Sequence, residues 1–83
     1  MKKEIILDRL VTLYSRMFNG NIDVTWVDKH LLGSLFNITP RDLVYFFLEV
    51  EREFAVKIPE RYIRNGDFCT LDKIANILVA LEV

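Results

Sequence analysis

The sequence predicts a single all-α domain over residues 1–83, with three main helices, a short third helix and a long first loop. Apolar residues recur at three- and four-residue spacing over most of the chain, which is the period of a helix rather than the alternation of a strand. Hydrophobic residues make up 52% of the chain, too many for a disordered segment. A chain of 83 residues has room for one small core, burying only about 60% of the surface that the unfolded chain exposes.

The first helix is expected over residues 3–18, because one face repeats apolar residues at helical spacing: Ile6, Leu10, Leu13, Tyr14 and Met17. Asparagine and glycine at 19–21 favour its termination. Residues 21–38 then form the long loop, whose apolar side chains are expected to pack across the helix ends: Ile22, Val24, Trp26, Leu31, Leu32, Leu35 and Phe36. We expect a short helical turn at 27–32 and a core position for Trp26.

The second helix is expected to begin at Pro40, with Thr39 as its N-cap and Asp42 in its electropositive first turn. Its interior contains more apolar residues than one buried face needs: Leu43, Val44, Tyr45, Phe46, Phe47, Leu48 and Val50. Some of these side chains must therefore face outward.

A short third helix is expected over residues 60–64, after Pro59 and closed by the Asn-Gly pair at 65–66. Thr70 can cap a last helix over residues 71–81. The buried face of that helix is expected to be Leu71, Ile74, Ile77, Leu78 and Leu81.

Composition excludes several classes of function. Eleven basic and twelve acidic residues give a net charge of −1, whereas a nucleic-acid binder needs a concentrated basic patch. The single cysteine, Cys69, excludes an intrachain disulfide and leaves too few thiolates for a zinc site. The apolar run at 5–7 is interrupted by Glu4 and Asp8, so neither a signal peptide nor a membrane span is expected. We expect a cytoplasmic protein.

No catalytic constellation is visible in the sequence. His30 is the only histidine, and no nucleophile and carboxylate are spaced around it in a pattern that indicates a triad. A solvated loop histidine is the expected role of His30, and a small half-buried thiol that of Cys69. The chain is therefore not expected to be an enzyme.

The stretch from Thr39 to Pro59, with Glu51-Arg52-Glu53-Phe54 followed by Val56-Lys57-Ile58-Pro59, resembles the second helix and following loop of acyl and peptidyl carrier proteins. The resemblance implies an acyl-carrier-like four-helix bundle. Carriers attach 4′-phosphopantetheine to a serine at the start of this helix, at the position of Pro40. Proline has no hydroxyl, so the resemblance implies a non-catalytic carrier-related protein without this cofactor. The chain is similar to carrier-related proteins of peptide-maturation systems that lack the attachment serine.

Two other interpretations remain. Gly33-Ser34-Leu35 superficially copies the carrier triplet, so the chain could be a genuine carrier with 4′-phosphopantetheine on Ser34, although this residue lies in the loop ahead of the second helix and a polar turn residue is preferred. A small ligand-binding domain that opens between the second and third helices is the other, but the sequence offers no polar anchor for a head group.

The carrier resemblance also assigns the two faces of the second helix. The positions that line a carrier core match Val44, Phe46, Phe47, Val50 and Phe54. The positions that partner enzymes read match Arg41, Asp42, Tyr45, Leu48, Glu51 and Arg52. Leu48 is expected to be exposed, while Tyr45 is either exposed or packed beneath the long loop. We therefore expect a monomer that binds a protein or a peptide-modifying enzyme through its second helix, since aromatic residues and arginine are enriched at interfaces.

Overall fold

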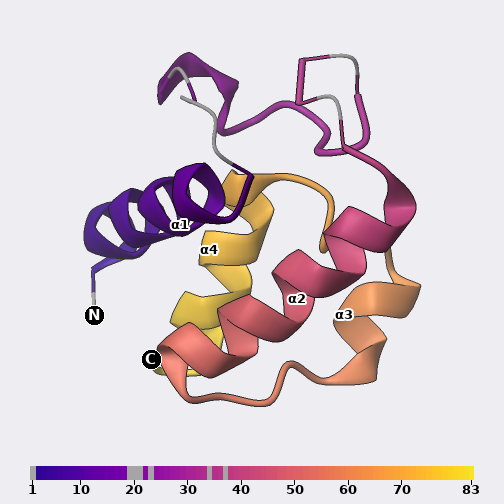
Figure 1. Cartoon of the computed structure of the whole chain (residues 1–83). Coiled ribbons are helices and arrows are strands. Elements are labelled where there is room, and N and C mark those ends of the chain that lie inside the picture. Colours follow the sequence, from indigo (N-terminus) through magenta and orange to yellow (C-terminus); the bar gives the residue numbers. More distant parts are fainter. Residues whose placement is uncertain (1, 19–21, 23, 34, 37) are drawn as a thin grey trace.

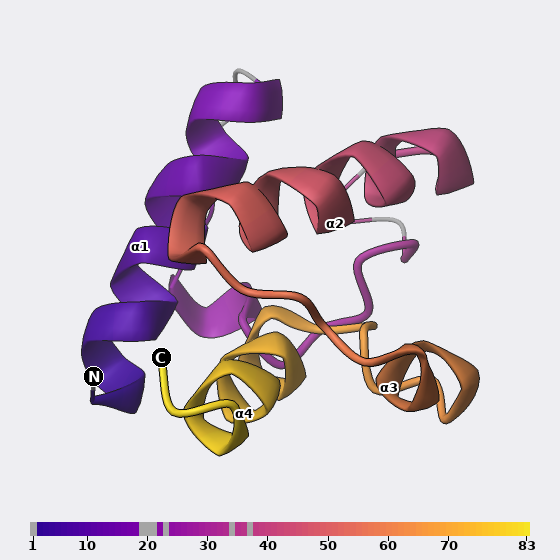
Figure 2. The ribbon, with the colours of Figure 1, turned by 90° about the horizontal axis from the view of Figure 1, so that it is seen from below.

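The computed structural model of the chain describes residues 2–18, 22, 24–33, 35–36 and 38–83. These residues form α1 (Lys3–Phe18), the 3₁₀ helix η1 (Val24–Trp26), α2 (Pro40–Phe54), α3 (Glu60–Arg64) and α4 (Leu71–Ala80). Figure 1 shows α1 and α3 on opposite sides of the molecule, with α2 and α4 between them, and Figure 2 shows the same arrangement from below. The predicted all-α class, the short third helix and the long first loop are confirmed.

The core lies where α1 packs against α4 and α2. The buried residues of α1 and α4 are Ile6, Leu10, Leu13, Tyr14, Leu71, Ile74, Ala75, Ile77 and Leu78. Met17 and Leu81, predicted on the same faces, are only partly buried against this core. The predicted end of α4 at residue 81 is wrong by one residue, because the helix ends at Ala80 and Leu81 is its C-cap.

Phe46 lies at the centre of an aromatic cluster and is fully buried. Its ring centroid lies 5.6 Å from that of Tyr14, 6.3 Å from that of Phe18 and 6.4 Å from that of Phe68. Val50 and Phe54 follow on the same helical face and are also buried. The rotation of α2 about its own axis is therefore fixed by contacts with α1 and with the segment before α4.

The start of α2 is specified locally. Thr39 Oγ1 accepts a hydrogen bond from Asp42 N at 3.2 Å, and Asp42 Oδ2 accepts one from Thr39 N at 3.0 Å, which forms a capping box. Pro40 occupies the first helical position, as predicted. At the other end, Ala55 has φ 54° and Val56 N donates to Glu51 O at 3.0 Å. This is a Schellman-type end with alanine where glycine is usual.

The other predicted helix signals are confirmed as well. Thr70 Oγ1 accepts a hydrogen bond from Lys73 N at 3.0 Å and caps α4. Gly66, just after α3, has φ 73°, a left-handed conformation that glycine adopts without strain. The predicted termination of α1 at 19–21 lies outside the described residues.

The helical turn in the long loop lies earlier than predicted. It occupies Val24–Trp26 rather than residues 27–32. A helical turn at 27–31 would pair Leu31 N with Val27 O, but these two groups bind the start of α4 instead. Val27 O accepts a hydrogen bond from Asp72 N at 2.8 Å, and Leu31 N donates to Cys69 O at 2.7 Å. Two tertiary hydrogen bonds therefore replace the local one.

The loop side chains are divided between core and solvent. Leu31 and Phe36 are buried, and Trp26 is half-buried with its ring edge-to-face on Phe36, the centroids 6.0 Å apart. Leu32 and Leu35 are exposed, so the prediction that they pack across the helix ends is wrong. Leu31 is held inward by its bond to Cys69, which turns the next residue outward.

Tyr14 connects the loop to α1. Its hydroxyl donates a hydrogen bond to Phe36 O at 3.2 Å in a buried position. Burial raises the pKa of Tyr14 from 10.0 to about 12, and the carboxylate of Asp42 adds to this shift. The phenol therefore stays neutral throughout the physiological range and remains a hydrogen-bond donor.

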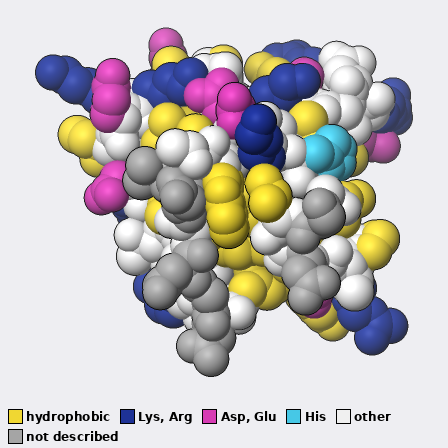
Figure 3. All heavy atoms as spheres, turned by 90° about the horizontal axis from the view of Figure 1, so that it is seen from above, with side chains coloured by type: hydrophobic (Ala, Val, Ile, Leu, Met, Phe, Trp, Pro, Cys, Tyr) yellow, Lys and Arg dark blue, Asp and Glu magenta, His cyan; other side chains and the backbone are white. Residues whose placement is uncertain are grey.

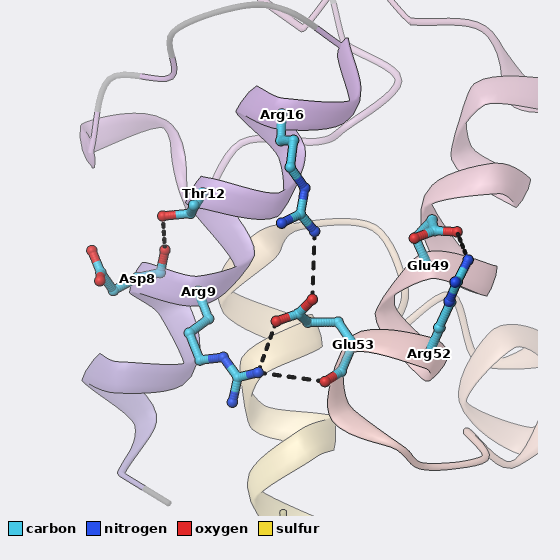
Figure 4. A network of polar contacts seen from close by, with 7 residues as sticks. All are labelled: Asp8, Arg9, Thr12, Arg16, Glu49, Arg52 and Glu53. Atoms are coloured by element: carbon cyan, nitrogen blue, oxygen red, sulfur yellow. Dashed lines mark hydrogen bonds and ion pairs between the residues drawn. The ribbon is translucent and has the colours of Figure 1, made fainter.

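Ion pairs join α1 to the last turn of α2 (Figure 4). Arg9 Nη2 donates to Glu53 Oε2 at 2.8 Å and to Glu53 O at 3.4 Å, while Arg16 Nη2 lies 3.4 Å from Glu53 Oε1. The Arg9 guanidinium also lies over the Phe54 ring, 4.7 Å from its centroid. The hydrogen bond from Arg9, with the charges of Arg9 and Arg16, holds the pKa of Glu53 below its ordinary value of 4.5.

We expect Glu53→Gln to lower the free energy of unfolding by roughly 1 kcal/mol at neutral pH, because it removes the charge from both ion pairs. The pKa of Glu53 is lower in the folded than in the unfolded chain. The stabilisation is therefore fully present above the pKa of the unfolded chain and is lost as the pH falls through the pKa of the folded chain. Urea denaturation of both proteins at several pH values measures the difference. The matched control is Glu60→Gln, which breaks only an exposed pair within α3; a difference that persists in acid would contradict the assignment.

Candidate interaction surface

The outward face of α2 carries Val44, Tyr45 and Leu48, whose exposed fractions are 57, 54 and 52%. Arg41 and Arg52 lie before and after them on the same side of the helix, because residues three, four, seven and eleven positions apart share a helical face. Together Arg41, Val44, Tyr45, Leu48 and Arg52 form a surface that we call the outward stripe. It is an apolar centre with an arginine at each end.

The packing of Phe46 explains why these side chains face solvent. A helix buries one face, and here that face contains Phe46, Val50 and Phe54. Val44 was predicted to line the core, and this prediction is wrong. It lies one turn before Leu48 and therefore on the same outward side. Because Leu48 was expected to be exposed, the four-residue spacing in the sequence could have predicted the same for Val44. Phe47, also predicted to line the core, is half-buried. The centroid of its ring lies 5.1 Å from that of the Phe68 ring.

Asp42 and Glu51 were predicted to face a partner, but both make intramolecular hydrogen bonds. Asp42 completes the capping box with Thr39. Glu51 Oε2 accepts a hydrogen bond from Ile58 N at 2.7 Å and holds the connection between α2 and α3. Both residues are half-buried, and neither belongs to the outward stripe.

The two arginines of the stripe remain available to a partner. Arg52 Nη1 lies 3.7 Å from Glu49 Oε1, and the Arg52 side chain is 83% exposed (Figure 4). An exposed ion pair of this kind contributes little to stability. Arg41 is exposed, and within the described part of the chain it forms no ion pair.

A hollow lies on each side of the stripe. The hollow towards α3 has a volume of about 400 Å³ and is lined mostly by apolar side chains: His30, Leu32, Pro40, Leu43, Val44, Phe47, Ile63, Gly66, Phe68 and Cys69. The hollow towards the end of α1 has a volume of about 490 Å³ and is lined by Met17, Phe18, Asp42, Tyr45, Leu48 and Glu49. The outward stripe is therefore a ridge between two depressions. The sequence did not indicate that Leu32 and Ile63 would meet across the first of them.

The remaining candidate residues are His30, Cys69 and Ser34. His30 is exposed on the long loop, where its Nδ1 accepts a hydrogen bond from Leu32 N at 3.1 Å. Figure 3 shows the face of the molecule that carries this loop, with hydrophobic side chains at its centre and the histidine side chain, in cyan, beside them. Cys69 is a half-buried free thiol, as expected. It also lines the hollow towards α3, which we call the α3-side hollow. Ser34, the alternative attachment residue, lies outside the described residues.

Neither a metal-binding cluster nor a membrane-spanning helix is found in the part of the chain that the structure describes. Its histidine, cysteine and carboxylate side chains form no group of three that could hold a metal ion. Across those same residues, no helix has the length and apolar character needed to cross a bilayer.

In comparisons with known proteins, the chain matches no protein-family model, no curated protein and no solved structure. Its function must therefore be inferred from its own residues and their geometry.

We expect Tyr45→Ala and Leu48→Ala each to change the free energy of unfolding by no more than about 0.5 kcal/mol, because both side chains are largely exposed. Phe46→Ala, one position from Tyr45 but fully buried, should destabilise the fold by about 3–5 kcal/mol. Thermal and urea denaturation followed by circular dichroism distinguish the two classes. Loss of cooperative unfolding in either exposed variant would mean that the outward stripe is part of the core.

Proposed function

We propose that this chain is a non-catalytic, carrier-related interaction module that binds a protein, such as a peptide-modifying enzyme, through the outward stripe of α2. The observation that carries this proposal is the group of three apolar side chains on one helix, each more than half exposed and bounded by Arg41 and Arg52. Adjoining exposed apolar side chains are typical of binding surfaces. An aromatic residue with nearby arginines is also the composition of an interface centre.

The carrier relationship is supported by the order of the helices and by the character of α2. Pro40 stands at the first position of α2, where the carrier resemblance places the attachment serine. The neighbouring hydroxyl, on Thr39, accepts the capping hydrogen bond from Asp42 N. We therefore propose a protein that uses the recognition helix of a carrier without the covalent arm. A role in peptide maturation rests on the resemblance to carrier-related proteins of such systems.

The arm can be tested by intact mass. After incubation with coenzyme A and a broad-specificity phosphopantetheinyl transferase, we expect no mass increase, because Pro40 has no hydroxyl. An ordinary carrier protein in the same reaction is the positive control.

If the mass does increase, two variants identify the residue that carries the arm. A gain of one phosphopantetheine that disappears in Ser34→Ala would identify a genuine carrier with a displaced attachment site. A gain that disappears in Thr39→Val instead would place the arm on the N-cap. Either gain would contradict the proposal of an armless module.

Partner binding can be tested by photo-crosslinking. With a photoreactive amino acid at Leu48, in cells that naturally express the chain, we expect a discrete crosslinked adduct. The matched control places the same group at Val79 of α4, which is 43% exposed and distant in sequence from the stripe. An adduct formed equally from both positions, or from neither, would contradict binding through α2.

A further inference from the structure

The charge of the outward stripe differs in sign from the net charge of α2 as a whole. The helix contains more carboxylates than guanidinium groups. Most of those carboxylates are engaged by other parts of the chain: Asp42 by Thr39 N, Glu51 by Ile58 N, and Glu53 by Arg9 and Arg16. Glu53 is neutralised by its two guanidinium partners, whereas Asp42 and Glu51 keep their charge but turn it towards the backbone groups that they bind. Glu49 is the remaining carboxylate of α2 and forms an exposed pair with Arg52 at 3.7 Å. The outward stripe itself therefore contains two arginines and no carboxylate, although the chain as a whole has a net charge of −1.

The distance between the two arginines sets the separation of the acidic groups that a partner would need. Arg41 and Arg52 are about three helical turns apart on one side of α2, which corresponds to roughly 16 Å along the axis. The apolar centre of the stripe lies between them. Charge complementarity then requires two carboxylates of the partner at a similar separation.

Val44 connects the stripe to the hollow of about 400 Å³ on the α3 side. The hollow is also lined by the apolar side chains of Leu32, Ile63 and Phe68. A volume of this size accommodates a bulky apolar side chain, and interfaces concentrate their binding energy where such a side chain fills a pocket.

We infer that the partner binds with an acidic peptide segment, whose carboxylates face Arg41 and Arg52 and whose bulky apolar side chain, between them, enters the α3-side hollow. This inference rests on the proposed docking through α2. A second copy of the chain is a poor occupant, because antiparallel pairing of two α2 helices would set arginine against arginine at both ends.

The probe is a display library of random peptides of about 16 residues, long enough to span three helical turns, selected against the full chain. We expect the enriched peptides to carry Asp or Glu on both sides of a large apolar residue. Their affinity should fall about tenfold for the double variant Arg41→Glu/Arg52→Glu and should weaken with added salt. The control Lys57→Glu/Lys73→Glu changes net charge equally at exposed lysines outside the stripe and should bind as the parent does.

The possible outcomes separate the inference from the proposed function. Peptides that lose affinity for Leu48→Ala but bind Arg41→Glu/Arg52→Glu as tightly as the parent would overturn the acidic partner and leave docking through α2 intact. No enrichment, or enrichment of peptides indifferent to Leu48→Ala, would contradict both.

The hollow has its own test with the selected peptides. Ile63→Trp fills the α3-side hollow and should abolish binding, whereas Val79→Trp, at an equally exposed position on α4, should not; both parent side chains are 43% exposed. Bound peptide should also slow alkylation of Cys69 by N-ethylmaleimide, because this thiol lies in the wall of the hollow. Unchanged binding to Ile63→Trp, or unchanged alkylation, would exclude the hollow as the seat of the apolar side chain.

Discussion

Burial of Phe46 fixes the rotation of α2, and the surface of the molecule depends on that rotation. The ring is held by Tyr14 and Phe18 of α1 and by Phe68 before α4. Rotating α2 by one residue would place the Tyr45 hydroxyl in the core, where an unpaired hydroxyl is unfavourable. With Phe46 inward, the apolar surplus of the helix must face solvent. The exposed apolar centre is thus a consequence of how the core is filled.

The charges of α2 follow from the same orientation. It brings Glu53 to Arg9 and Arg16 of α1, and it leaves Glu51 beside the backbone of the following connection, where Ile58 N is available. These carboxylates hold the helix to its neighbours. The arginines at the two ends of the outward face have no comparable role in the fold, since Arg52 has only a long pair with Glu49. An acidic helix therefore has an outward stripe whose charged residues are both arginines.

The long loop contributes His30 and Leu32 to the lining of the α3-side hollow. Val27 and Leu31 hydrogen-bond to Asp72 and Cys69 at the start of α4. This ties the loop to the capped end of α4 and turns Leu32 outward towards Val44 and Ile63. The two hydrogen bonds that replace a local helical turn thereby position Leu32 in the lining of the hollow beside the stripe.

The sequence by itself determined the helices, the capped starts of α2 and α4, and the absence of a hydroxyl at Pro40. These features depend on residues within one or two turns of one another, as in the hydrogen bonds of Thr39 with Asp42 and of Thr70 with Lys73. Only the tertiary structure decided which face of α2 is buried, that the loop turn lies at Val24–Trp26, and that Glu51 binds Ile58 N whereas Arg52 pairs with Glu49 of its own helix. Periodicity showed that α2 has too many apolar residues for one face, but which face is buried depends on rings and backbone groups far away in the chain.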